Sequence, residues 1–178
     1  MLNKTGIKNA PFVLVVRDPY KRFESYYKDK VLRAGQTFKR TGVWQQGVRI
    51  LFPFLDINDT TPDEEVARRI ESMTLDQLTE ILPDIYLKDG HLQLQSKLLY
   101  AKFSRYSVRT QTGVSYDRIF KMESHDDKQR LADLFDLDLS ARSNSTSHQG
   151  FKVSWSEEAK RIVRDVYASD FSNFEYPT

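Results

Sequence analysis

The sequence contains no cysteine among its 178 residues, and only three histidines. The lack of cysteine excludes disulfides, thiolate metal ligands and cysteine nucleophiles. His91, His125 and His148 lie far apart and lack metal-ligand spacing, so we predict no metal site. No signal peptide or membrane anchor is visible, and together with the missing cysteines this favours a cytoplasmic location.

Long hydrophobic runs are also missing. The longest strongly apolar run is 12–16, which has the length of a strand and not the roughly 20 residues of a membrane span. Hydrophobic residues make up 39% and charged residues 29% of the chain, as in globular proteins. Because a chain of this length fits one domain, we predict a single domain over 1–178.

A net charge of only +2 hides an uneven distribution. Residues 17–49 contain nine Lys and Arg against three acidic residues, whereas 56–84 contain nine acidic residues against two arginines. The basic segment suggests an anionic ligand nearby, although two oppositely charged faces that attract each other would give the same pattern. The near balance argues against a nucleic-acid partner, because such domains are usually strongly basic.

The most informative local feature is the turn after the first predicted strand. The unbroken apolar run 12–16 predicts a strand buried on both faces of a parallel sheet. Asp18 and Pro19 then favour the start of a helix over 19–33. Ligands of open α/β sheets bind beyond the carboxyl ends of the strands, which is where Arg17 stands.

The residues at this turn suit a phosphate group. The Arg17 guanidinium, the Ser25 hydroxyl and the N-terminus of the helix all supply hydrogen-bond donors. In the alternative interpretation, Arg17 pairs with a carboxylate and Ser25 has no role in binding.

The rest of the chain predicts mainly helices. Segment 34–60 is interrupted by glycines and a proline, which predicts an irregular insertion. Hydrophobic spacing and capping residues predict further elements: helices from Thr61 and Thr74, a helix over 91–103, a strand over 116–122, a helix after Ser124, a polar loop over 138–153 and a last helix from Ser154.

The run FVLVVRDPYKRFESYYKDKV resembles the 3′-phosphate-binding segment of sulfotransferases that use 3′-phosphoadenosine-5′-phosphosulfate (PAPS). In that family a strand precedes Arg-(Asp/His/Asn)-Pro, and an Arg, a Ser and an aromatic residue follow at fixed spacing. The first Arg and the Ser hold the 3′-phosphate of the donor. The resemblance therefore assigns this role to Arg17 and Ser25, and gives Arg22 no fixed role.

Later motifs resemble the carbohydrate sulfotransferase branch, so that the resemblance covers about 11–176. They are His91 with Gln95, Tyr116-Asp117, Lys121-Met122-Glu123, the loop Asn144–His148, and Trp155–Tyr167 followed by DFSNFEY. The resemblance implies a helix-rich α/β fold with a P-loop-NTPase-like parallel sheet flanked by helices. It also implies transfer of a sulfuryl group from PAPS to a hydroxyl of a carbohydrate acceptor, without a metal.

One family motif is not found. The loop with Lys and Ser/Thr that cradles the 5′-phosphosulfate should lie some tens of residues before the Arg-Asp-Pro turn, but only sixteen residues precede Arg17. We therefore expect an N-terminally incomplete fold, and a catalytically inactive binding or interaction module is the alternative function. Loss of a central strand would expose an edge of 12–16, where a second copy could pair to form a homodimer.

Two side chains are candidates for the base that accepts the proton of the acceptor hydroxyl. His91 follows Gly90 at a predicted turn, and imidazole titrates near neutral pH. Glu123 is the alternative base. In the competing interpretation its side chain caps the next helix or forms a hydrogen bond to a loop. The aromatic and basic stretch 38–54 could line an acceptor cleft, or its aromatic residues could form the core of the insertion.

Overall fold

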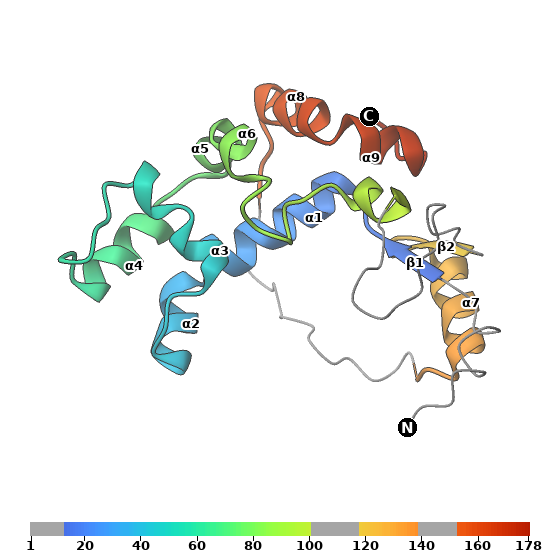
Figure 1. Cartoon of the computed structure of the whole chain (residues 1–178), viewed down its shortest axis with the longest axis horizontal. Helices are drawn as coiled ribbons and strands as arrows, with labels where there is room; N and C mark the ends of the chain where they lie inside the picture. Colours follow the sequence, from blue (N-terminus) through green and yellow to red (C-terminus); the bar gives the residue numbers. More distant parts are fainter. Residues whose placement is uncertain (1–12, 101–117, 139–152) are drawn as a thin grey trace. The chain divides into compact units, whose positions relative to one another are not determined.

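The computed structural model describes residues 13–100, 118–138 and 153–178, which fall into two compact units (Figure 1). Unit 1 comprises the described residues up to Asp18 together with 95–100 and 118–138. Unit 2 comprises 19–94 and 153–178. The boundary at Asp18–Pro19 divides the predicted phosphate-binding motif, so Arg17 belongs to unit 1 and Ser25 to unit 2.

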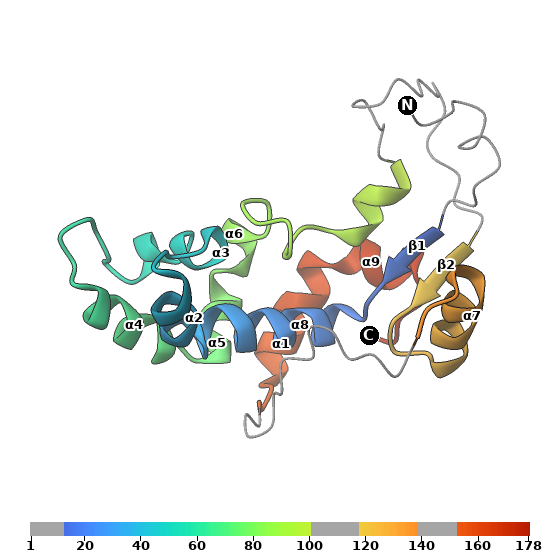
Figure 2. The ribbon, with the colours of Figure 1, turned by 90° about the horizontal axis from the view of Figure 1, so that it is seen from below.

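A two-stranded parallel sheet forms the centre of unit 1. Strand β1 (Val13–Val16) pairs with β2 (Arg118–Lys121), with Val13 opposite Arg118 and Val16 opposite Lys121. Helix α7 (His125–Phe135) follows β2 and runs beside the sheet (Figure 2). A 3₁₀ segment, η4 (Gln95–Tyr100), completes the described elements of this unit. The predicted helix-rich α/β class with parallel strands is thus confirmed.

The prediction that the first strand is buried on both faces is wrong. Leu14 and Val16 are buried, whereas the side of the strand that carries Val15 faces solvent, with Val15 39% exposed. Successive side chains point to opposite faces of a strand, so the burial alternates even though the sequence does not. Within the described part of unit 1, β1 pairs along one edge only.

Helix α7 begins where the sequence predicts. The Ser124 hydroxyl accepts a hydrogen bond from the backbone N–H of Asp127 at 3.1 Å. The Asp127 carboxylate in turn accepts the N–H of Lys121 at 2.9 Å, which fixes the turn between β2 and the helix. Such a cap satisfies N–H groups that have no partner inside the helix.

Unit 2 is helical. Helix α1 (Pro19–Tyr26) continues into a π-helical turn, η2 (Tyr27–Val31), so the helix predicted over 19–33 is largely confirmed. The other elements are α2 (Ala34–Thr41), α3 (Gln46–Arg49), η3 (Phe52–Phe54), α4 (Asp63–Glu71), α5 (Leu75–Glu80), α6 (Leu82–Ile85), α8 (Glu157–Val166) and α9 (Ala168–Asn173).

The prediction of an irregular segment over 34–60 is wrong for α2, α3 and η3. Two of its glycines allow a close contact between helices or end a helix. Gly35 donates its N–H to Glu71 Oε1 at 2.9 Å, and a Cβ on Gly35 would lie only 2.8 Å from the same oxygen. Its lack of a side chain lets α2 approach α4. Gly42 ends α2 in the left-handed conformation with φ 71°, which favours glycine.

Local capping signals succeed in some places and fail in others. The capping box at Thr74 is present, with Thr74 and Gln77 bonded to each other's backbone. At α4 the N-cap is Pro62, and the hydroxyl of Thr61 instead accepts the N–H of Asn58. Helix α8 is capped by Ser156, two residues after the predicted start.

The prediction of a helix over 91–103 is wrong for 91–94, which form no helix. The 3₁₀ segment η4 follows them within the described residues. Residues 101–103, 116–117 and most of the predicted loop 138–153 lie outside the described residues, as does Phe12.

The core of unit 2 gathers around α8. This helix packs against α1, α5 and α6, and the buried side chains at these contacts include Phe23, Leu78, Leu82 and Val163 (Figure 1). Within the described residues, no helix has the length and apolar character needed to cross a bilayer.

An exposed ion-pair network on α4 gives the first prediction. Hydrogen bonds from Arg68 and Arg69 hold the pKa of Glu65 down at about 2. Its contribution to stability is therefore present above pH about 4.3, the ordinary value for Glu, and is lost as pH falls towards 2. We expect Glu65→Gln to lower the urea midpoint at pH 7, and to lower it much less at pH 2, where Glu65 is partly protonated in the wild type. An equal difference at both pH values would contradict this assignment.

Candidate functional site

The backbone at Arg17 is held by a side-chain amide. The Arg17 N–H donates to Gln95 Oε1 at 2.9 Å, and Gln95 Nε2 donates to the Arg17 carbonyl at 2.7 Å. Both bonds lie within unit 1 and join residues 78 positions apart. Gln95, which the sequence analysis pairs with His91, therefore fixes the backbone at the end of β1. The spacing of residues in the sequence did not reveal this role.

Glu123, which follows β2, contacts the same turn after β1, the Arg17–Asp18 corner. Its Oε2 accepts the Asp18 N–H at 3.1 Å, and its Oε1 lies 3.7 Å from Arg17 Nε. Among the roles considered for Glu123 (base, helix cap and bond to a loop), the contact that the structure shows is the bond to a loop. The Arg17 side chain is 42% exposed, and among the described residues its terminal nitrogens Nη1 and Nη2 have no hydrogen-bond partner.

Ser25 lies on α1 in unit 2. It is partly buried, and its hydroxyl makes no side-chain hydrogen bond to any described residue. The hydroxyl is thus available as a donor. Within the described residues, no hydrogen bond joins the Ser25 hydroxyl to His91, the candidate base of the same unit.

His91 forms a pair with a buried carboxylate. Its Nδ1 lies 2.9 Å from Asp89 Oδ1, and the same oxygen accepts the His91 backbone N–H at 2.7 Å. The imidazole is 73% exposed, whereas the Asp89 side chain is 6% exposed. A carboxylate can only accept, so Nδ1 carries the proton and the lone pair of the neutral ring lies on Nε2.

The surroundings of Asp89 restrict its position. A Cβ on Gly47 would lie 2.7 Å from Asp89 Oδ2, so this carboxylate packs directly against the Gly47 backbone. Tyr26 donates its hydroxyl to the Gly47 carbonyl. Burial, followed by the nearby Asp89 charge, raises the pKa of Tyr26, so the phenol stays protonated and keeps this bond.

The segment after His91 is tied to α1, α8 and α9 by Arg22. Its Nη1 donates to the Gln93 carbonyl at 2.9 Å, and its Nη2 lies 3.2 Å from Oδ2 of the fully buried Asp170. The guanidinium also lies 4.7 Å from the ring centre of Tyr167, whose hydroxyl donates to the Leu92 carbonyl at 2.8 Å. Arg22 therefore has a structural role in unit 2.

The aromatic residues of 38–54 line a pocket in the same unit. Phe38, Trp44 and Phe52 are partly exposed, and they border a cavity of about 390 Å³ near α2 and α4. They do not form the closed core that was the alternative interpretation. Among the described residues, no group of three or more His, Asp or Glu side chains is arranged to hold a metal ion.

The candidate residues are divided between the two units. In unit 1 the strand β1 is followed by the partly exposed Arg17, and in unit 2 the exposed ring of His91 pairs with the buried Asp89. An arginine is suited to binding an anionic group, and a histidine is suited to accepting a proton.

Comparison with known proteins gives the family. The profile of the Sulfotransferase family matches residues 3–177. Because this match spans nearly the whole chain, the chain belongs to the sulfotransferase family, whose members are transferases that move a sulfuryl group. No curated protein and no solved structure matches the chain.

Proposed function

We propose that this chain transfers a sulfuryl group from PAPS to a hydroxyl of a carbohydrate acceptor. Sulfotransferases generally use PAPS as the donor, and the proposal assigns its 3′-phosphate to Arg17 and Ser25. The observation that carries it is the held corner at Arg17, where Gln95 and Glu123 fix the strand end and the terminal nitrogens of the guanidinium remain available.

The donor set of the corner fits a phosphate. An arginine fork makes two parallel charge-assisted hydrogen bonds to phosphate oxygens. Glu123 approaches Arg17 through Nε, which orients the fork without occupying its terminal nitrogens. Ser25 and α1, which begins at Pro19, belong to unit 2, and the family motif is what assigns the Ser25 hydroxyl to the same phosphate.

His91 serves as the base in this proposal. The donor supplies a sulfuryl group bound to a phosphate leaving group. His91 Nε2 takes the proton of the acceptor hydroxyl as its oxygen bonds to sulfur, and the sulfur–oxygen bond to the phosphate breaks with its electron pair on the phosphate. Asp89 acts as a positioning residue, because it fixes the ring and keeps the proton on Nδ1.

The donor site is tested by the preference for a 3′-phosphate. We expect the chain to bind adenosine 3′,5′-bisphosphate more tightly than adenosine 5′-monophosphate in calorimetric titrations. Arg17→Ala should weaken bisphosphate binding about 10- to 150-fold, because hydrogen bonds to charged groups contribute about 1.5–3 kcal/mol. Its effect on the monophosphate should be small.

Arg130→Ala is the matched control, since Arg130 is an exposed arginine of the same unit. It should leave both affinities unchanged. If Arg17→Ala bound the two nucleotides with the wild-type preference, the assignment of the 3′-phosphate to Arg17 would be wrong.

A further inference from the structure

We infer that the pocket beside Trp44 is a subsite that binds a neutral sugar ring of the acceptor. The inference rests on the proposed function for the identity of the acceptor, but its geometry lies entirely within unit 2. A volume of about 390 Å³ lies within the range of small-ligand sites, roughly 300–1,000 Å³. Its lining includes Phe38, Trp44, Arg49, Phe52, Asp59 and Asp63.

The indole of Trp44 is held rigidly in the wall of the pocket. It stacks on Phe38 with ring centres 4.3 Å apart and planes inclined by 13°, and the ring centre of Phe52 lies 6.3 Å away with its plane inclined by 74°. Its Nε1 donates to Asp63 Oδ1 at 2.8 Å. A large aromatic surface fixed in this way loses little conformational entropy when an apolar face packs on it.

Polar groups beside the aromatic rings remain available for a ligand. Arg49 and Asp59 are exposed, and within the described residues neither side chain has a hydrogen-bond or ion-pair partner. Arg49 can only donate and Asp59 can only accept. Sugar hydroxyls both donate and accept, and the ring C–H groups present an apolar face. A pyranose therefore matches both the aromatic and the polar parts of this wall.

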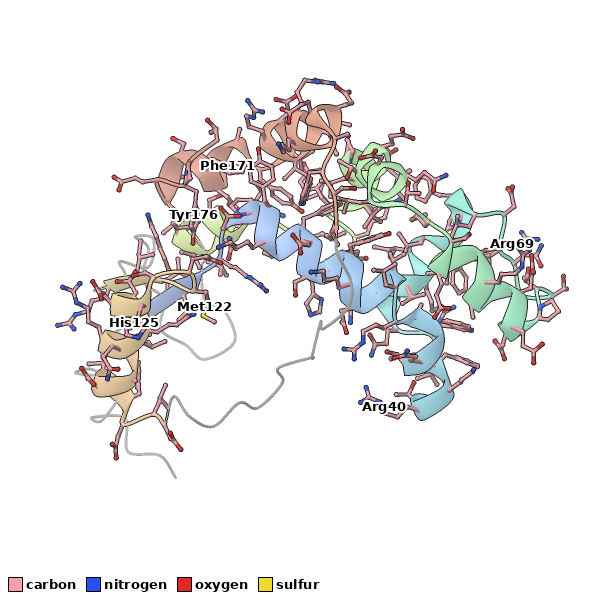
Figure 3. The ribbon with its side chains drawn as sticks, turned by 180° about the vertical axis from the view of Figure 1, so that it is seen from behind. Arg40, Arg69, Met122, His125, Phe171 and Tyr176 are labelled. Atoms are coloured by element: carbon pink, nitrogen blue, oxygen red, sulfur yellow. The ribbon has the colours of Figure 1, made fainter. Side chains whose placement is uncertain are left out.

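The charge of the lining argues for a neutral ligand. The lining contains two carboxylates, Asp59 and Asp63, and one guanidinium, Arg49, so a phosphate or a densely sulfated chain would meet net repulsion. Lys39 and Arg40 are exposed towards the end of α2 and are not part of the lining; Figure 3 labels Arg40 there. The pocket is thus chemically distinct from the basic corner expected for the nucleotide.

The test uses tryptophan fluorescence of the full chain without PAPS. The chain has two tryptophans. The second, Trp155, packs against Tyr20 with ring centres 5.5 Å apart and planes inclined by 79°. In a Trp155→Phe background Trp44 is the sole reporter. We expect chitotetraose or an N-acetyllactosamine tetrasaccharide to give a saturable change, whereas unsulfated chondroitin hexasaccharide, which is anionic, should bind at least tenfold more weakly.

Two surface variants keep the test independent of folding. Arg49→Ala and Asp59→Ala should each weaken oligosaccharide binding severalfold, and both should raise the acceptor KM in the transfer assay without changing the KM for PAPS. Arg17→Ala should leave oligosaccharide binding unchanged, so failure of the donor site and failure of this subsite are distinguishable. Lack of a saturable change with both neutral oligosaccharides, wild-type binding by both variants, or a response to adenosine 3′,5′-bisphosphate instead would overturn the inference.

Discussion

Replacing His91 with alanine is expected to lower kcat about 10²- to 10⁴-fold, the usual contribution of a positioned general base. The reason is the loss of Nε2, the nitrogen that holds the lone pair of the neutral ring when Nδ1 donates to Asp89. Binding of adenosine 3′,5′-bisphosphate should be unchanged, because that ligand is assigned to Arg17 and Ser25. The measurement is steady-state transfer of labelled sulfate from PAPS, with nucleotide affinity determined separately.

His125→Ala is the matched control, since His125 is an exposed histidine at the start of α7, where Figure 3 labels it. It should retain full activity. Asp89→Ala should lower kcat by a smaller factor than His91→Ala. In ¹⁵N spectra of the imidazole it should also remove the predominance of the Nδ1–H form. If His91→Ala kept the wild-type kcat, His91 would not be the base.

Replacing Arg22 with alanine is expected to lower the free energy of unfolding by about 3–5 kcal/mol, the usual cost of removing one member of a buried ion pair. The carboxylate of Asp170 is fully buried and the Arg22 side chain is 14% exposed, so this ion pair lies largely out of water. The variant also removes the donor to the Gln93 carbonyl, close to His91. Denaturation by urea measures the loss.

The loss of unfolding free energy in Arg22→Ala is compared with the loss caused by breaking exposed ion pairs. Arg161 forms ion pairs with Glu158 and Asp165 on the surface of α8, and Arg161→Ala should lower the free energy of unfolding much less than Arg22→Ala does. If Arg22→Ala does not fold, the double variant Arg22→Met/Asp170→Leu should recover much of the stability, because it leaves no buried charge unpaired. Equal small losses for Arg22→Ala and Arg161→Ala would contradict a buried ion pair.

Features encoded by neighbouring residues could be predicted from the sequence. The strand that ends before Arg17, the helix from Pro19, the capping box at Thr74 and the Ser124 cap each depend on residues within one or two turns. The family resemblance rested on the same kind of signal, a motif of contiguous residues, and it is confirmed at the level of the sulfotransferase family.

Features that depend on distant residues could not be predicted in this way. Arg22 pairs with Asp170, 148 positions away, and Gln95 bonds Arg17 across 78 positions. Gly35 suggested an irregular segment, because only the packed structure shows that α4 approaches it. The pair of Asp89 and His91 is local in sequence, and an acidic residue two positions before a candidate base was the signal that could have indicated it.

The most direct test of the proposed function is transfer of ³⁵S from labelled PAPS to a panel of unsulfated glycans, with and without His91. We predict label on a glycan hydroxyl with the wild-type chain, and a loss of about 10²- to 10⁴-fold with His91→Ala. A wild-type chain that binds adenosine 3′,5′-bisphosphate through Arg17 but labels no glycan would contradict the proposal and identify a catalytically inactive binding module.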